Sequence, residues 1–239
     1  MKQFVFENDV LGADFVADEI VKIITAKPTA LLCLAAGHSS LPVFERLIDA
    51  TKKGSADFSH VRFVGLDEWL DVDSDCEGAC GSFLTRSLFT PIGIGHHQIC
   101  LFNPRTPDTA AECARVETYI AQCGGIDYIL LGMGMNGHLA LNEPGDSFEN
   151  GAHEVKLSQT TKEIAPKYFP AGIPPLERGI TLGIKNILAA KVLHLTIFGA
   201  HKKGVVQQLM NNPVSEDFPA SVLKNCDHAV VVFDKAAFA

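Results

Sequence analysis

The chain has 239 residues, of which 47% are hydrophobic and 20% charged, a composition typical of globular proteins and unlike that of disordered ones. Its 20 basic and 28 acidic residues give a net charge of −8, which argues against a general nucleic-acid partner because phosphate backbones attract basic surfaces. No segment offers the roughly 18 unbroken apolar residues that a membrane span needs. Glu7 and Asp9 come too early for a secretory signal, so we expect a cytoplasmic protein without membrane or nucleic-acid partners.

Seven cysteines are scattered along the chain, an odd number in a protein long enough to fold without disulfides. Cys76 and Cys80 form the one close pair, and no second pair or histidine follows at the spacing of a zinc finger. We therefore expect free thiols and no metal site.

The hydrophobic pattern alternates between helical periodicity and short apolar runs. Val16, Ile20 and Ile24 lie at helical spacing near the start, whereas residues 31–35 form a continuous apolar run typical of a strand buried on both faces. In chain order, the pattern predicts a helix over 9–26, a strand over 31–35, a helix over 41–48, a strand over 61–66, a helix over 82–89, a helix over 108–122, a strand over 126–131, a helix over 181–190, a strand over 192–198, a helix over 201–210 and a strand over 229–233.

This alternation predicts an α/β fold, a Rossmann-like three-layer sandwich in which a mainly parallel sheet carries helices on both faces. The proline-containing stretches at 90–107 and 169–175 read as loops inside one domain spanning residues 1–239. In such sheets ligands bind beyond the carboxyl ends of the strands. That rule selects four segments, at 37–40, 67–68, 132–143 and 199–202.

The first and last of these segments suggest an anion site. Gly37, Ser39 and Ser40 join a strand to a helix, so that hydroxyls and free backbone amides gather at the helix start. The alternative is that one serine simply caps the helix. Lys202 opens a later helix and either adds a positive charge to such a site or lies in solvent.

Two adjacent carboxylates, Asp67 and Glu68, follow the strand at 61–66. Successive residues of a strand point to opposite faces, so the two cannot share one role. One of them could be a general base, particularly where burial raises its pKa. The alternative is a purely structural carboxylate, which stabilises a loop or the start of a helix and takes no part in catalysis.

A glycine-rich segment follows the strand at 126–131. Its G-x-G-x-x-G spacing over residues 132–137 matches a dinucleotide-binding fingerprint, but Asn142 and Pro144 interrupt the helix that this motif requires, so the pattern disfavours a nucleotide cofactor. The turn instead presents His138 and, five residues later, Glu143. A histidine beside a carboxylate on a loop at the ligand edge favours proton transfer over a purely structural role.

These residues resemble a known family. Residues 132–145, GMGMNGHLALNEPG, resemble the signature loop of the glucosamine-6-phosphate deaminase family, and residues 66–69, LDEW, resemble its LDEY strand end. Residues 37–40, 180–184 and 199–202 match in order and spacing, so the resemblance covers nearly the whole chain. Asn136, where glucosamine-type members carry Asp, and residues 219–221 are more similar to galactosamine-6-phosphate isomerase/deaminase.

The resemblance implies a mechanism. His138 opens the sugar ring, Glu143 supports the charged imidazole, Asn136 orients it, and Asp67 moves a proton between C2 and C1 before ammonia leaves. Gly37, Ser39, Ser40 and Lys202 would hold the phosphate, with Lys162 where glucosamine-type members have an arginine. The implied substrate is an amino-hexose phosphate, and the implied chemistry needs no cofactor.

Rival functions remain open. A sugar-lactone phosphate hydrolase of the related 6-phosphogluconolactonases would continue GHTASLFP after the Gly-His turn, where this chain has Asn142 and Glu143. A sensor that binds but does not turn over a sugar phosphate would be expected to lack a base or a histidine. The sequence leaves open the preference between galacto and gluco substrates, the oligomeric state, and whether Trp69 lines the site or the core.

Overall fold

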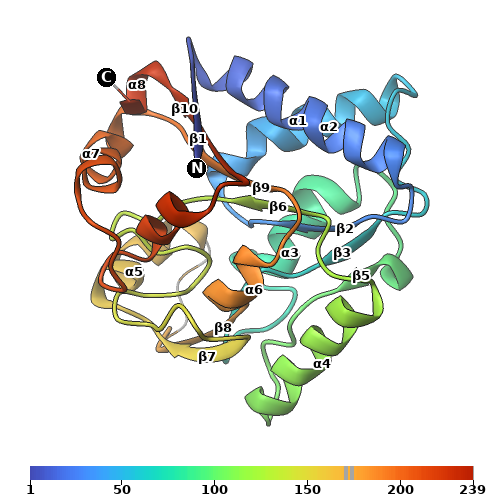
Figure 1. The fold of residues 1–239 in the computed structure, drawn as a ribbon. Coiled ribbons are helices and arrows are strands. Elements are labelled where there is room, and N and C mark those ends of the chain that lie inside the picture. The colour runs from blue at the N-terminus through green and yellow to red at the C-terminus, as the bar shows by residue number, and fades with distance from the viewer. Residues whose placement is uncertain (170–171, 173–174, 239) are drawn as a thin grey trace.

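The computed structural model describes residues 1–169, 172 and 175–238, and its centre is a seven-stranded sheet whose neighbouring strands all run parallel (Figure 1). Its order is β1-β10-β9-β6-β2-β3-β5. These strands are β1 (Lys2–Phe6), β2 (Leu31–Leu34), β3 (Arg62–Val64), β5 (Ile99–Cys100), β6 (Tyr128–Leu131), β9 (Leu193–Ile197) and β10 (Ala229–Asp234). The predicted α/β fold with a mainly parallel sheet is confirmed.

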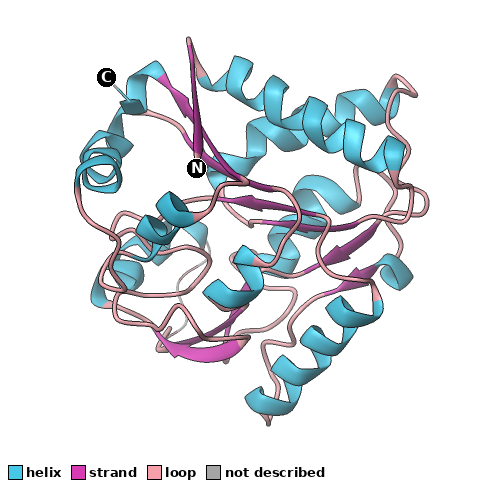
Figure 2. Cartoon of the chain, in the orientation of Figure 1, coloured by secondary structure: helices cyan, strands magenta, loops and turns pink. Residues whose placement is uncertain are grey.

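Helices cover both faces of this sheet (Figure 2). Helices α1, α2 and α3 pack on one face, and α4, α6 and α7 on the other, because alternate residues of each strand point to opposite sides: Leu32 joins the first layer and Leu31 the second. The helices are α1 (Asp9–Ala26), α2 (Leu41–Lys52), α3 (Cys80–Leu84), α4 (Thr109–Gln122), α5 (Gln159–Ile164), α6 (Ile184–Leu188), α7 (Lys203–Asn211) and α8 (Lys235–Phe238).

Local sequence fixes several of these boundaries. The Asn8 side chain accepts a hydrogen bond from the backbone N–H of Leu11, at 3.0 Å, and so caps the start of α1. Asp108 does the same for α4 through Ala111, at 2.9 Å. The helix predicted at 82–89 begins two residues earlier and continues beyond α3 as one wider turn over Thr85–Phe89.

The chain reverses direction through the sheet at β2. From β2 it moves outward to β3 and β5, then returns through α4 to β6 on the other side of β2 and continues to β9 and β10. Loops leaving the carboxyl ends of β2 and β6 therefore diverge and leave room for a ligand between them. This arrangement positions segments 37–40 and 132–143 on the two sides of one opening.

A second, antiparallel sheet was not predicted. It consists of β4 (Asp67–Trp69), β8 (Arg178–Thr181) and β7 (His153–Lys156), in the order β4-β8-β7. These strands are too short for their alternation to stand out, and the helix predicted at 181–190 is wrong in its first part because β8 ends at Thr181. The edge strands β1 and β5 were missed as well, and β5 has only two residues.

All seven cysteines lie in the described part of the chain and are free thiols, as predicted. Among the described residues, no helix is long and apolar enough to cross a bilayer. Most of the loop predicted at 169–175 lies outside the described residues.

Candidate active site

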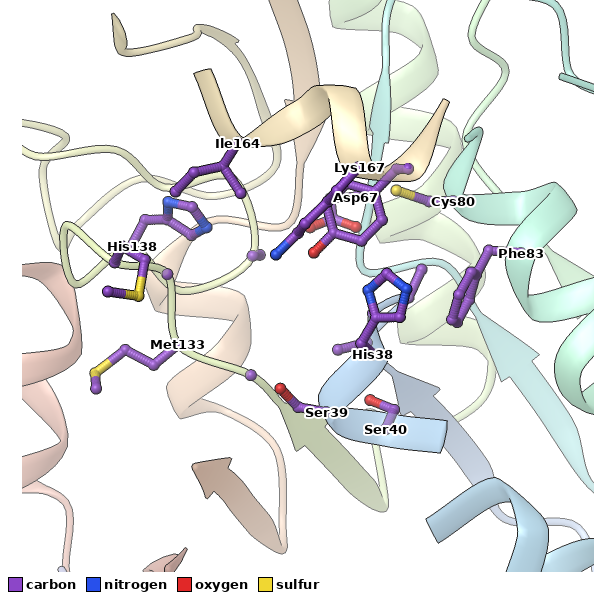
Figure 3. Close-up of a pocket in the computed structure, with 18 of the residues that line it drawn as sticks. His38, Ser39, Ser40, Asp67, Cys80, Phe83, Met133, His138, Ile164 and Lys167 are labelled. Carbon is purple, nitrogen blue, oxygen red and sulfur yellow. The ribbon is translucent and has the colours of Figure 1, made fainter. Parts of the chain in front are cut away.

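A cavity of about 460 Å³ opens at the carboxyl edge of the main sheet, where the strand order reverses. Its walls come from the loops after β2, β6 and β9, from β4, and from the segment after α5. Figure 3 shows Asp67, His138, Lys167 and the two serines of the loop after β2 arranged around this space. The structure thus gathers residues from all four segments that the ligand-edge rule selected, 37–40, 67–68, 132–143 and 199–202.

Asp67 is the first residue of β4, and its side chain lines the cavity. Burial, together with the charge of Glu68, raises the pKa of this carboxyl to about 7 against the opposing effect of a hydrogen bond from the Cys80 thiol. A carboxyl that titrates near neutral pH can take up and return a proton at pH 7, which is what a general base for carbon acids requires.

Glu68 points the other way, as the alternation of a strand predicts. Its carboxylate accepts three backbone hydrogen bonds, from Trp69 at 2.9 Å and from Cys80 and Gly81 at 2.8 Å each. Burial raises its pKa, and these bonds oppose the rise. Glu68 therefore anchors the start of α3, and Asp67 is the carboxylate left for chemistry.

The glycine-rich turn after β6 forms a tight loop. The backbone N–H of Gly134 donates to the carbonyl of His138 at 3.0 Å, and that of Gly137 donates to the carbonyl of Gly134 at 3.1 Å. A Cβ at Gly134 would lie 2.3 to 2.5 Å from the imidazole, and Gly137 has a φ of +82°, so both positions favour glycine. Residues 139–150 contain no helix, unlike a dinucleotide-binding turn.

His138 meets a carboxylate and a hydroxyl through the same ring nitrogen. Its Nδ1 lies 3.8 Å from Oε2 of Glu143 and 3.4 Å from Oγ1 of Thr161. Burial lowers the pKa of the imidazole, Glu143 raises it, and the charges of Lys202 and Lys167 lower it. The net direction is downward, so the ring is neutral near pH 7 and able to accept a proton.

Asn136 acts on His138 through Glu143. Its Nδ2 donates to Oε2 of Glu143 at 2.8 Å and to Oγ of Ser158 at 3.1 Å, while its Oδ1 accepts the backbone N–H of His138 at 3.3 Å. The amide thus contacts the main chain of His138 and the carboxylate of Glu143, and not the imidazole ring itself. Glu143 is 4% exposed and also accepts the N–H of Ser158 at 3.2 Å.

The loop after β2 faces the cavity with Gly37, Ser39 and Ser40. A 3₁₀ turn over His38–Ser40 leads into α2. Within residues 37–52, all of them described, neither serine side chain makes a capping hydrogen bond, so the simple capping role is wrong. The two hydroxyls are left for the cavity.

Lys202 reaches the same space from the loop after β9. Its Nζ donates to the carbonyl of Met133 at 2.5 Å. Burial, together with the charge of Lys167, lowers its pKa to about 8. The alternative of a solvated surface lysine is therefore wrong, because this ammonium lies at the wall of the cavity.

Lys162 does not join the site. It pairs with Glu177 outside the cavity, so its prediction as a phosphate ligand is corrected. Lys167, five residues on, lines the cavity instead, because the helix α5 gives way to a 3₁₀ turn at Pro166 that aims the next residues inward. A lysine between proline and Tyr168 was the signal that sequence reasoning overlooked.

Aromatic rings close one side of the cavity. The imidazole of His38 stacks on Tyr168 with ring centroids 5.3 Å apart and meets the edge of Phe83 at 6.3 Å. Trp69 belongs both to the core and to the wall: it is 6% exposed, donates from Nε1 to the carbonyl of Gly78 at 3.1 Å, and lines the cavity.

A Rossmann-type sheet with a carboxylate, a histidine–carboxylate pair and two lysines around one cavity at the switch point defines an α/β enzyme with acid–base groups. The chain belongs to the family of glucosamine-6-phosphate isomerases and 6-phosphogluconolactonases, whose model matches residues 11–232. The resemblance seen in residues 132–145 is thereby confirmed.

Individual relatives agree with this membership. A glucosamine-6-phosphate deaminase of Bacillus pumilus (strain SAFR-032) is 35% identical over 231 residues, which cover 97% of this chain and 95% of that protein. The protein AgaI of Escherichia coli (strain K12) is 34% identical over 217 residues, 91% of this chain and 85% of AgaI. A solved monomeric glucosamine-6-phosphate deaminase has a TM-score of 0.94 at 31% identity, covering 99% of this chain and 98% of its own.

The lactonase branch shares the architecture. A 6-phosphogluconolactonase from Trypanosoma brucei has a TM-score of 0.75 at 22% identity, covering 99% of this chain and 97% of its own. At that identity the likeness concerns the fold alone.

Proposed function

We propose that this enzyme converts an amino-hexose 6-phosphate into a ketose 6-phosphate and ammonia, with galactosamine 6-phosphate as substrate and tagatose 6-phosphate as product. The observation that carries the proposal is the presence in one cavity of Asp67, with a pKa near 7, and of His138, whose Nδ1 lies 3.8 Å from the carboxylate of Glu143. Aldose–ketose isomerisation needs these two functions, a base for a carbon-bound proton and a shuttle for oxygen-bound protons.

The phosphate would bind at the side of the cavity formed by Ser39, Ser40, Lys167 and Lys202. A phosphate ester carries up to two negative charges, and hydroxyl donors and ammonium groups are its usual partners. We propose Lys167 in place of Lys162 as the second cation, since Lys167 lines the cavity.

The reaction would proceed by proton transfers. Neutral His138 takes the proton of the anomeric hydroxyl and returns it to the ring oxygen, which opens the pyranose. Asp67 removes the proton from C2 of the open chain and returns it to C1, while the C1 oxygen gains a proton and the nitrogen loses one, so that the aldehyde becomes an alcohol and the C2 amine becomes an imine. Water adds to this imine, the carbon–nitrogen bond breaks, and ammonia leaves with a ketone at C2. Glu143 stabilises the imidazolium that forms in the first step.

The galacto preference rests on Asn136 and on residues 219–221, which resemble galactosamine-type members. Ala220 donates its N–H to the carbonyl of Gly137 at 2.8 Å, so this segment supports the turn that carries His138. The second candidate, glucosamine 6-phosphate giving fructose 6-phosphate, is favoured by the names of the relatives at 31–35% identity. We expect the enzyme to act in the cytoplasm.

The test is ammonia release from galactosamine 6-phosphate and glucosamine 6-phosphate in parallel, with hydrolysis of 6-phosphogluconolactone as a third assay. The wild type is compared with Asp67→Asn and with the control Asp75→Asn, which changes an exposed carboxylate on the same connection. We expect faster turnover of the galacto substrate, lost only in Asp67→Asn. Faster turnover of the gluco substrate would overturn the specificity and keep the chemistry. Lactone hydrolysis without ammonia would overturn the reaction.

A further inference from the structure

A group of hydrogen-bonded side chains joins His138 to the start of α5, and two of its members, His138 and Thr161, line the cavity. Asn136, His138 and Glu143 come from the turn after β6, whereas Ser158 and Thr161 come from the start of α5. The Oγ of Ser158 lies 3.1 Å from Nδ2 of Asn136 and 3.1 Å from Oγ1 of Thr161, which in turn lies 3.4 Å from Nδ1 of His138. Thr161 is 4% exposed, so its hydroxyl depends on partners within the protein.

The direction of these hydrogen bonds follows from counting donors. The amide of Asn136 must present its NH₂ to Glu143 and Ser158, because its oxygen facing a carboxylate would be repelled. Ser158 Oγ also accepts the backbone N–H of Thr161 at 3.2 Å, so both of its lone pairs are used and its own O–H must donate. The acceptor is Oγ1 of Thr161.

Thr161 therefore accepts a hydrogen bond from Ser158 and keeps its own proton to donate. Among the described residues, the acceptor that the structure offers to this proton is Nδ1 of His138. Donation to Nδ1 requires that this nitrogen be unprotonated, which leaves the proton of a neutral ring on Nε2. A hydrogen bond to Glu143 instead requires a proton on Nδ1, since the carboxylate can only accept.

We propose that Thr161, oriented by Ser158 and Asn136, is a positioning residue that holds neutral His138 with its proton on Nε2, and that Glu143 takes over Nδ1 when the ring becomes charged. The two partners thus serve two protonation states of one imidazole. In the resting enzyme Nε2 then carries the proton, so the ring takes the anomeric proton on Nε2 only after passing to the Nδ1–H form, whose N–H Glu143 accepts. This assignment rests on the proposed function only in taking His138 as the group that carries the proton.

The charged groups around the ring come from three elements: Glu143 from the turn after β6, Lys167 from the segment after α5, and Lys202 from the loop after β9. None of them supplies a proton to Nδ1 in the way that a hydroxyl does, because the carboxylate only accepts and, among the described residues, neither lysine is hydrogen-bonded to the ring. The side chain at position 136 determines which groups donate and which accept along the hydrogen bonds from Asn136 through Ser158 to Thr161. With Asn136→Asp, the new carboxylate would accept from Ser158, and Thr161 would lose the bond that orients it.

The experiment measures the tautomer of His138 by ¹⁵N NMR of protein labelled at histidine, because the shifts of the two ring nitrogens report which one carries the proton. The chain has nine histidines, and a His138→Gln variant identifies the relevant signals. Thr161→Val removes the hydroxyl at nearly constant volume, Thr161→Ser restores it, and Thr160→Val changes the neighbouring threonine as the matched control. One hydrogen bond corresponds to roughly a two- to tenfold change in the tautomer ratio.

We expect Thr161→Val to shift the ratio two- to tenfold towards the Nδ1–H form and to raise the pKa of His138, with Thr161→Ser like the wild type and Thr160→Val unchanged. Asn136→Asp should shift the ratio in the same direction, and it carries the test if Thr161→Val does not fold. An unchanged ratio in the folded variants, or an equal shift in Thr160→Val, overturns the assignment. If the ratio shifts while neither amino sugar releases ammonia, the proposed function fails and the assignment of Thr161 stands.

Discussion

Replacing Asp67 by Asn is expected to abolish activity and to stabilise the protein in a pH-dependent way. Burial raises the pKa of this carboxyl from 3.8 to about 7. A carboxyl whose folded pKa lies above its unfolded value destabilises the native state as pH rises from about 4 to 7, because ionisation is then easier in the unfolded chain. The difference sets a ceiling of about 4 kcal/mol at alkaline pH. Since solvent reaches part of the side chain, we expect Asp67→Asn to gain about 1–3 kcal/mol at pH 8.5.

The assay is urea unfolding of wild type, Asp67→Asn and the control Asp75→Asn at pH 5 and pH 8.5. Most of the gain should appear between these two values, and the control should show none, because its carboxylate is exposed. Turnover of an amino-hexose phosphate should fall at least 100-fold in Asp67→Asn alone, the scale of a lost general base. A gain of equal size at both pH values, or a loss at pH 8.5, would refute the argument that burial makes this carboxyl a base.

Three further outcomes are expected. Lys167→Met should raise KM for a phosphorylated substrate roughly 10- to 100-fold, the worth of one charged hydrogen bond, while Lys162→Met leaves KM within about twofold; equal effects would contradict the assignment of the cavity lysine. Glu143→Gln should lower kcat about 100-fold with little change in KM, which steady-state kinetics would check. Burial lowers the pKa of His194 to about 4, so stability should fall by up to about 3 kcal/mol as pH drops from 6.5 to 4, and the slope should flatten in His194→Gln, as urea unfolding at a series of pH values can test.

The main sheet could be predicted from sequence because its central strands are apolar on both faces. β2 and β6 are fully buried runs of four residues, and each is followed by glycine and polar residues at the ligand edge. The small antiparallel sheet could not be predicted in this way. Its strands have three or four residues, and one of them, β7, reads His-Glu-Val-Lys, a pattern set by pairing with β8 and not by burial.

The residues of the site also differ in whether they could be predicted from the sequence. His138, Glu143 and Asp67 could be found because each follows a strand that the hydrophobic pattern identifies. Lys167 could not, because its direction depends on the change from α-helix to 3₁₀ turn after Ile164, and the family resemblance pointed to Lys162 instead. The role of Thr161 depends on which hydroxyl donates to which acceptor, and that order appears only when α5 and the glycine turn are seen side by side.

The two cavity lysines have a consequence for how an anion would bind. Lys202 has a pKa of about 8, lowered by burial and by the charge of Lys167, so near pH 8 about half of the molecules lack its proton. A phosphate dianion placed beside it favours the ammonium form and draws a proton from the solvent. Binding should therefore be accompanied by proton uptake, and the apparent enthalpy measured by calorimetry at pH 8 should change with the ionisation enthalpy of the buffer. The affinity would weaken above that pH although the ligand keeps its charge, because each bound anion then requires a proton that the medium supplies less readily.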